Sequence, residues 1–232
     1  IIQYNISPEK IVGESSHGIN VNKMLDMKVP LNYLKTEGAC LTPNGAKFKT
    51  DSQGFLPEMM EKMYNERVVF KKRMIKAKQQ YERTKNPKLV KEIARCHNIQ
   101  WSKKIALNSA YGAVGNQYFR YYDVRQASGI TTAGQFIIRF IENRMNEYLN
   151  KVLQTHGQID YIVASDTDSI YVTLDKLVEK TCKDKTKEQK IDFLDKVVEK
   201  KLEPYIAKCF EELADYSNAF KNAMVMKREV IA

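Results

Sequence analysis

The sequence is poor in cysteine and histidine, and neither residue type forms a group. Four cysteines stand at positions 40, 96, 182 and 209, and three histidines at 17, 97 and 156. These distances exclude the common zinc and dithiol motifs, whose ligands lie a few residues apart. The scattered cysteines indicate a reducing, intracellular compartment. They also leave little basis for a histidine-based metal or nucleophile site.

Long hydrophobic runs are absent. The best candidate, Phe136-Ile137-Ile138, is interrupted by Arg139, so we expect no membrane-spanning segment and no membrane partner. No signal peptide is visible and the first residue is not methionine, which suggests a fragment or a processed piece. With 43% apolar residues among 232, the chain can form a sizeable core, as one large domain or two small ones.

Acidic residues are scarce in one window. Between Lys71 and Lys104 lie twelve lysines and arginines but only two acids, Glu82 and Glu92. This window therefore carries the whole formal net charge of +10, and the rest of the chain is balanced. A basic element on a balanced protein favours a polyanionic partner such as phosphate, nucleotide or nucleic acid. On charge alone, a solvated helical face explains the window equally well.

Glycine and proline are frequent in residues 1–56 and absent from 58–85. The first region is therefore predicted to be irregular, with a β-ribbon around 39–56 that turns at Asn44-Gly45 in a type I′ turn. Helices are predicted from about 58 to 85 and 88 to 111, joined at Asn86-Pro87 as an antiparallel αα-hairpin.

The second half of the sequence alternates helical and strand-like patterns, which indicates an α+β fold. The expected elements, in chain order, are the end of the hairpin's second helix at Gly112 and Gly115, an amphipathic helix after a capping box at Thr132 to Gln135, strands at 159–165 and 169–174, a helix at 188–213 kinked or divided at Pro204, and a last strand at 224–231.

Asp166-Thr167-Asp168 forms the predicted tip between the two strands. Two carboxylates at one tip repel each other unless a cation lies between them. Magnesium prefers carboxylate oxygens and keeps room for water and phosphate. The alternative is an ordinary Asx-type turn, and the D-x-D pattern alone favours that alternative.

Two helix faces of the hairpin carry groups that suit a nucleotide. Arg67 and Lys71 share one face, and Lys104, Asn108 and Tyr111 share another. The cations and the amide suit a triphosphate, and the tyrosine suits a base or sugar. Ordinary surface cations and a core tyrosine are the alternatives. Together with the acidic turn, these faces favour metal-assisted phosphoryl transfer.

Two segments resemble a known family. "KKIALNSAYG" (103–112) is similar to the K-x3-N-S-x-Y-G motif of family B DNA polymerases, and "SDTDSIYV" (165–172) to their D-T-D-S motif. Residues 115–135 and the final "KREVIA" resemble members of the T-even bacteriophage type. The resemblance covers essentially the whole chain. It implies that 1–56 and 113–232 form the palm, with an antiparallel sheet backed by helices, and that 57–112 form the fingers hairpin.

The resemblance implies roles for the acidic residues. Asp168 looks like the palm aspartate that ligates the catalytic magnesium ions. Asp166 is its neighbour in the motif, nearer the primer end and less essential. Glu229 resembles a third palm acid with a secondary role.

The resemblance also implies nucleotide and DNA contacts. Arg67, Lys71, Lys104 and Asn108 look like ligands of the incoming triphosphate, with Lys104 also part of the catalytic set, and Tyr111 looks like the tyrosine beside the nascent base pair. The implied DNA-binding residues, where the template approaches closely, are Gly112, Gly115 and Asn116.

The implied function is template-directed addition of dNTP to a primer 3′-hydroxyl with two magnesium ions. Primer-template DNA and dNTP are the implied partners. A sliding clamp and a single-strand-binding protein are implied for a full-length parent, in the cytoplasm of an infected bacterial host. The family's D-x-x-S-L-Y-P-S motif would come immediately before Ile1, and so would its metal aspartate. We therefore expect the isolated chain to be inactive.

Two alternatives remain. The chain is a natural half of a split polymerase that binds nucleotide or DNA without chemistry, or it is another magnesium-dependent phosphoryl transferase such as a nuclease. The second alternative ranks last, because the sequence offers no water-activating histidine or glutamate near the acidic tip.

Overall fold

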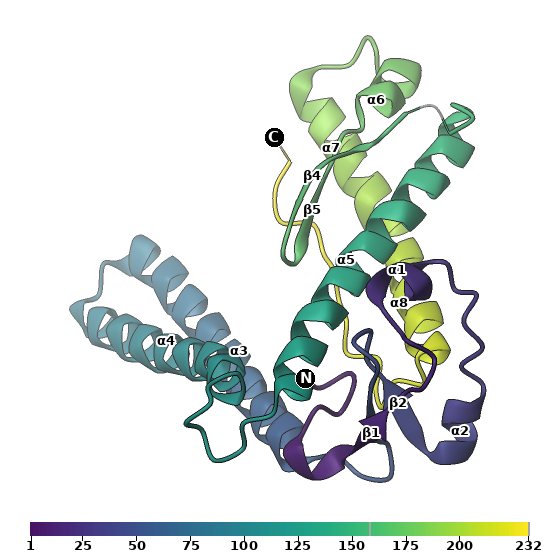
Figure 1. Cartoon of the computed structure of the whole chain (residues 1–232). Helices are drawn as coiled ribbons and strands as arrows, with labels where there is room; N and C mark the ends of the chain where they lie inside the picture. The colour runs from purple at the N-terminus through teal and green to yellow at the C-terminus, as the bar shows by residue number, and fades with distance from the viewer. Residues whose placement is uncertain (158, 232) are drawn as a thin grey trace.

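The computed structural model of the chain describes residues 1–157 and 159–231. It has an α+β fold, as predicted, in which a body of helices and small sheets carries a long helical arm on one side (Figure 1). The elements are the 3₁₀ turn η1 (Pro8–Lys10), β1 (Ile11–Glu14), α1 (Val21–Leu25), α2 (Tyr33–Glu37), β2 (Ala39–Leu41), β3 (Ala46–Lys49), α3 (Phe55–Thr84), α4 (Pro87–Val114), α5 (Val124–Leu153), β4 (Ile162–Asp166), β5 (Ser169–Val172), α6 (Asp175–Thr181), α7 (Lys187–Val197), the π-helical turn η2 (Val198–Leu202) and α8 (Glu203–Tyr216).

The long amphipathic helix α5 organises the body. Its apolar residues recur every three or four positions, so Phe136, Phe140 and Met145 are buried on one stripe. This stripe belongs to the main hydrophobic core, which also contains Phe48 of β3 and Leu213 of α8. The core interpretation of the stripe is therefore confirmed.

The predicted start of α5 was wrong. The helix begins at Val124, where the Asp123 side chain accepts a hydrogen bond from the amide of Arg125 and serves as the N-cap. Thr132 lies inside the helix, and its hydroxyl donates to the carbonyl of Ser128 at 2.8 Å. The capping-box spacing misled us because a threonine can bond back to the preceding turn without ending a helix.

The N-terminal sheet has three antiparallel strands in the order β1-β3-β2. The predicted ribbon exists as β2 and β3, but its turn is not type I′, because Gly45 alone adopts a positive φ (+89°) while Asn44 does not. Asn44 instead donates a side-chain hydrogen bond to the carbonyl of Arg125 at 2.8 Å. The turn thereby binds the sheet to the start of α5.

The strands β4 and β5 form a separate antiparallel hairpin, so the described residues contain two small sheets. Ile162, Ile170 and Val172 pack against the main core, whereas Val163 and Tyr171 on the other face are exposed. The hairpin contacts α5, and Asp166 pairs with Ser169 at its tip. The core thus fixes one face of the hairpin and leaves its end in solvent.

The helices α3 and α4 pack against each other along the arm. Lys85 ends α3 in the left-handed conformation (φ +51°), and the Asn86 side chain caps α4 by accepting from the amide of Lys88, with Pro87 in the first turn. The observed ends of α3 and α4 differ from the predicted ones by no more than three residues. Gly112 is still helical and Gly115 is the C-cap of α4.

Pro204 divides the last helical region as predicted, because it stands in the first turn of α8 directly after the π-helical turn η2. The predicted strand at 224–231 was wrong: its described residues form no strand. The amide of Arg228 donates to the Glu203 carboxylate at 3.2 Å, so among the described residues it takes no part in strand pairing. Among the described helices, none combines the length and hydrophobicity needed to cross a bilayer.

Candidate metal and nucleotide site

The acidic tip is a tight and strained turn. Asp168 donates its amide to the carbonyl of Asp166 at 2.5 Å, and Thr167 between them has φ +46°. A β-branched residue rarely adopts a positive φ, because its Cβ crowds the backbone. Strain of this kind persists where the surrounding structure enforces it, and it is frequent at functional sites.

Both carboxylates of the tip are exposed. Asp166 Oδ1 accepts from the Thr167 hydroxyl at 2.9 Å, and Asp168 Oδ1 accepts from the Ser169 hydroxyl at 3.4 Å. Within the described part of the chain, neither carboxylate has a lysine or arginine ion-pair partner. Two such carboxylates fit a magnesium ion that completes its octahedron with water and phosphate oxygens.

Glu229 does not join this pair in the structure. No group of three histidine, cysteine, aspartate or glutamate side chains that could hold a metal occurs among residues 1–157 and 159–231. The neighbour of Glu229, Arg228, is held beside α7 and α8 by Asp195 at 2.6 Å and by Glu203. The third predicted metal ligand therefore stays a prediction, and the tip itself supplies two carboxylates.

The cations of the arm lie at a defined level of the helix pair. Lys103 of α4 forms an ion pair with Glu66 of α3, so the adjacent residues Arg67 and Lys104 lie at about the same height. This ion pair lowers the pKa of Glu66 below its ordinary range. Arg67 Nε is buried and has no hydrogen-bond partner among the described residues. A buried guanidinium nitrogen without an acceptor is costly.

The other predicted nucleotide ligands are exposed on the arm. Lys104 places its ammonium 5.2 Å from the centre of the Trp101 ring, three residues earlier on α4. Lys71 and Asn108 are exposed, and neither side chain has an ion-pair or hydrogen-bond partner among the described residues. These groups are therefore available to a ligand.

The last predicted nucleotide-binding residue, Tyr111, and the predicted DNA-binding residues lie at the root of the arm. Tyr111 is 42% exposed on the last turns of α4. Gly112 and Gly115 follow at the end of the helix, and a Cβ at Gly112 would meet no atom within 4 Å. Asn116 begins the loop to α5, and its side-chain Oδ1 accepts a hydrogen bond from the amide of Tyr118 at 3.0 Å.

The structure distributes the predicted site over two parts. The carboxylates of Asp166 and Asp168 share one turn on the body, and Arg67 and Lys104 share one level of the arm. Figure 1 shows the tip of the β4–β5 hairpin pointing toward the end of the body from which the arm projects. Acids that can hold a metal and cations that can hold phosphates are the two components of phosphoryl transfer.

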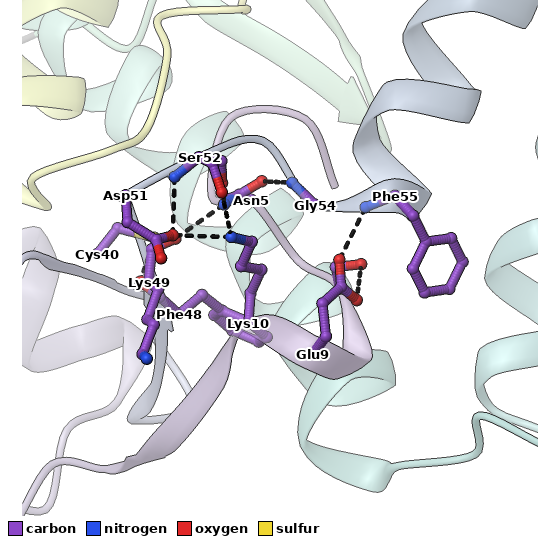
Figure 2. A network of polar contacts seen from close by, with 11 residues as sticks. Asn5, Glu9, Lys10, Cys40, Phe48, Lys49, Asp51, Ser52, Gly54 and Phe55 are labelled. Carbon is purple, nitrogen blue, oxygen red and sulfur yellow. Dashed lines mark hydrogen bonds and ion pairs between the residues drawn. The ribbon is translucent and has the colours of Figure 1, made fainter.

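Sequence reasoning missed two features of the arm. Trp101 beside Lys104 was not singled out, although the i, i+3 spacing is a visible signal of the contact. The contacts that fix the first turn of α3 come from residues 5–9, almost 50 positions earlier (Figure 2). No local sequence pattern indicates pairings at such separations.

A family model described as DNA polymerase family B matches residues 1–213. The chain belongs to this family.

Two relatives match the chain over its whole length. They are the DNA-directed DNA polymerases of Escherichia phage RB69 and Enterobacteria phage T4, each 33% identical over 275 aligned residues. The chain spans 30% of the length of each. A DNA polymerase beta of African swine fever virus (strain Badajoz 1971 Vero-adapted) is 27% identical over 191 residues, covering 75% of this chain and 14% of that protein.

A solved structure of a family B DNA polymerase from the archaeon Pyrobaculum calidifontis aligns with 85% of this chain and 20% of its own. The TM-score is 0.46 and the sequence identity is 22%. The predicted family membership is confirmed by the family model and the phage relatives.

Proposed function

We propose that the chain forms part of a DNA-directed DNA polymerase, which adds dNTP to a primer 3′-hydroxyl under the direction of a template. The observation that carries this proposal is the match of the whole chain to two phage proteins named as such polymerases. The acidic turn and the cationic arm support it, because they supply the two kinds of charge that phosphoryl transfer needs. The proposed setting is the cytoplasm of an infected bacterial host.

In this proposal the acidic turn holds the metal. Asp168 and Asp166 would ligate magnesium, which, when bound, neutralises the phosphate oxygens and activates the primer hydroxyl. Both carboxylates are exposed at the turn around Thr167, where a ligand can reach them. Glu229 is proposed only as a secondary acid, because the described residues do not group it with Asp166 and Asp168.

The arm binds and orients the nucleotide. Arg67 and Lys104, at one level of the helix pair, bind the triphosphate and hold its α-phosphate in line with the primer 3′-oxygen, while Lys71 and Asn108 add contacts. That oxygen attacks the α-phosphate, and pyrophosphate leaves. Tyr111 packs beside the nascent base pair, and Gly112, Gly115 and Asn116 allow the template to approach the root of the arm.

The 232-residue chain by itself is proposed to be inactive. Two-metal catalysis uses ions about 4 Å apart that share several carboxylates. The described residues contain no group of three histidine, cysteine, aspartate or glutamate side chains that could hold a metal. In primer extension, we expect no product from this chain alone and product from a longer polymerase that contains it. Robust extension by the chain alone would contradict the inactivity.

One observation favours a second candidate, a half of a split polymerase that binds DNA or nucleotide without chemistry. The exposed basic window of the arm needs no metal to bind a polyanion. Both candidates predict DNA binding that weakens steeply with salt and survives Asp168→Asn. They differ in whether the acidic turn takes part in primer extension by a longer protein that contains this chain, which only the catalytic candidate predicts. Clamp and single-strand-binding partners are proposed for such a longer protein alone.

A further inference from the structure

The helix α3 has no N-cap of its own. Its N-cap position is Gly54, whose lack of a side chain leaves the first amides of a 30-residue helix without a local acceptor. Three acceptors from the N-terminal segment replace it. The amide of Gly54 donates to Asn5 Oδ1 at 2.8 Å, that of Phe55 to Glu9 Oε1 at 2.8 Å, and that of Leu56 to the Ser7 hydroxyl at 3.3 Å.

These acceptors are themselves fixed. The Ser7 hydroxyl donates to Glu9 Oε2 at 2.7 Å, so one carboxylate joins Ser7 to the helix amide. The Asn5 side chain, fully buried, donates to the carbonyls of Lys49 and Ser52 at 2.8 and 2.9 Å. Figure 2 shows Asn5, Glu9, Gly54 and Phe55 within one polar network. We call Asn5, Ser7 and Glu9 the root clamp.

An ion pair also holds the same segment to the body. Lys10, 8% exposed, donates to Asp51 Oδ1 and to the Ser52 hydroxyl, both at 2.7 Å (Figure 2). The contact at Gly54 is also close, because a Cβ there would lie 2.5 Å from Ser7 Cβ. The backbone of the clamp and the first turn of α3 therefore fit together without room for a side chain.

The hydrophobic support at this root is small. The root cluster, separate from the main core, has three buried members, Leu56, Met60 and Val114, with Ile1 and Ile2 packed beside them. Beyond this cluster most of the arm's residues are exposed or half-buried. Polar contacts at the root therefore contribute a large share of what fixes the direction of α3.

We propose that Glu9, through the root clamp, is a positioning residue that sets the direction of the arm and thereby the placement of Arg67 and Lys71 on the incoming nucleotide. The effect on nucleotide binding rests on the proposed polymerase function. The effect on the direction of the arm rests on the contacts of the root clamp alone.

The length of the arm amplifies small errors at the root. Arg67 lies twelve residues and Lys71 sixteen residues beyond Phe55, or about 18 and 24 Å along the helix. A tilt of about 10° at the root displaces these groups by about 3–4 Å. Misplacement of a binding group by about 1 Å can cost about 10²-fold in rate. A clamp that touches no substrate can therefore control nucleotide use.

The charge of the clamp also suits its place. Partial desolvation alone would raise the pKa of Glu9, but hydrogen bonds from the Ser7 hydroxyl and the Phe55 amide outweigh it, so the pKa is lowered. Glu9 is therefore an anion at neutral pH, and it lies at the positive end of the α3 dipole.

The first experiment measures the direction of the arm without activity. Spin labels are attached at Gln79→Cys near the arm's end and Lys35→Cys on the body; both positions are exposed, whereas the native cysteines are buried. Glu9→Ala should broaden or shift the distance distribution, and Glu9→Gln, which keeps an acceptor oxygen, should restore most of it. An unchanged distribution in Glu9→Ala overturns the inference.

The matched control is Glu58→Ala. Glu58 also lies in the first turn of α3, but its side chain bonds to no described residue. This control removes the same charge from the same helix end without removing a contact to the body. A change in Glu58→Ala equal to that in Glu9→Ala would overturn the clamp, because the dipole alone would then explain the result.

The second experiment measures kinetics in the polymerase that contains this chain. Glu9→Ala should reduce kcat/KM for dNTP by about tenfold or more, mainly through a higher KM for dNTP, with the KM for primer-template unchanged. If the arm moves but dNTP use does not change, the positioning role is overturned and the polymerase function stands. If wild type adds no dNTP, the polymerase function fails, and the label distances still decide the direction of the arm.

Discussion

The arm and the body of this chain are stable for different reasons. The body buries a continuous hydrophobic core in which α5, α8 and the N-terminal sheet take part. The arm is held by the contact of α3 with α4, by ion pairs such as Lys103–Glu66 and Arg73–Glu92, and by the small root cluster. The body carries the acidic turn, and the arm carries the cations. Their separation makes the orientation of the arm a determinant of any joint site.

The largest effect is expected from the core. Phe136→Ala should lower the free energy of unfolding by about 3–5 kcal/mol, because a fully buried aromatic ring is replaced by a cavity. Ile105→Ala on the exposed face of α4 is the arm control and should change it by no more than about 0.5 kcal/mol. Denaturant titration measures both. Equal losses would show that the arm and body share one core.

Removal of the metal carboxylate should act on chemistry and leave stability intact. In the polymerase that contains this chain, Asp168→Asn should lower kcat by at least about 10²–10³-fold, the scale for losing one group that stabilises transition-state charge. Asp192→Asn, an exposed aspartate of α7, is the control and should extend primers normally. Primer extension at saturating dNTP measures the loss. Near-normal kcat in Asp168→Asn would remove the acidic turn from the mechanism.

The arm cation should affect binding more than turnover. Arg67→Ala should raise the KM for dNTP by about 10–150-fold, because a hydrogen bond to a charged group is worth about 1.5–3 kcal/mol. Arg83→Ala, near the far end of α3, is the control of equal charge and should keep the KM within about twofold. Steady-state kinetics at varied dNTP concentration gives KM and kcat separately for both variants. A similar rise for both would indicate a diffuse charge effect.

The smallest effects concern the pH dependence of stability. A buried thiol of the body should lose its contribution at alkaline pH, and two glutamates that hold the arm should lose theirs at acid pH. Burial raises the pKa of the Cys40 thiol in the body from 9.0 to about 12. The unfolded chain releases this proton above pH 9 while the folded body retains it, so the associated stability is present below pH 9 and lost as pH rises toward 12. The Tm measured by thermal unfolding should fall as the pH rises above 9. In Cys40→Ala, the Tm should fall less steeply with pH.

The arm should respond at acid pH instead. The pKa values of Glu9 and Glu66 are lowered in the folded protein. Their contribution is present above the unfolded glutamate pKa of about 4.3 and lost as pH falls through the lower folded values. The arm-to-body label distance should therefore broaden below about pH 4, before the body unfolds. A distance that stays unchanged until global unfolding would contradict separate control of the two regions.

Local patterns predicted the arm well. The absence of glycine and proline from 58–85, followed by Asn86-Pro87, specifies two helices and the turn between them, and the structure places the boundaries within three residues. The acidic hairpin followed from alternating strand patterns and its turn residues. Periodicity and turn chemistry act within a few residues, so the sequence alone exposes them.

The errors occurred where a contact outside the predicted motif decided the outcome. Residues 224–231 have the composition of a strand, but the amide of Arg228 finds the Glu203 side chain and no neighbouring strand. Thr132 has the spacing of a cap, but its hydroxyl bonds within a helix that Asp123 had already begun. The turn at Asn44 is not type I′, and the Asn44 side chain donates to the carbonyl of Arg125 in α5.

The sequence by itself determined the family, the basic window, the acidic turn and the helices of the arm, because each depends on residue types at short spacing. The tertiary structure alone decided that Arg67 and Lys104 share one level, that the Arg67 Nε lacks a partner, and that Glu9 caps a helix that begins at Phe55. These features join residues up to almost 50 positions apart. Only folding of the whole chain brings such groups within hydrogen-bond distance.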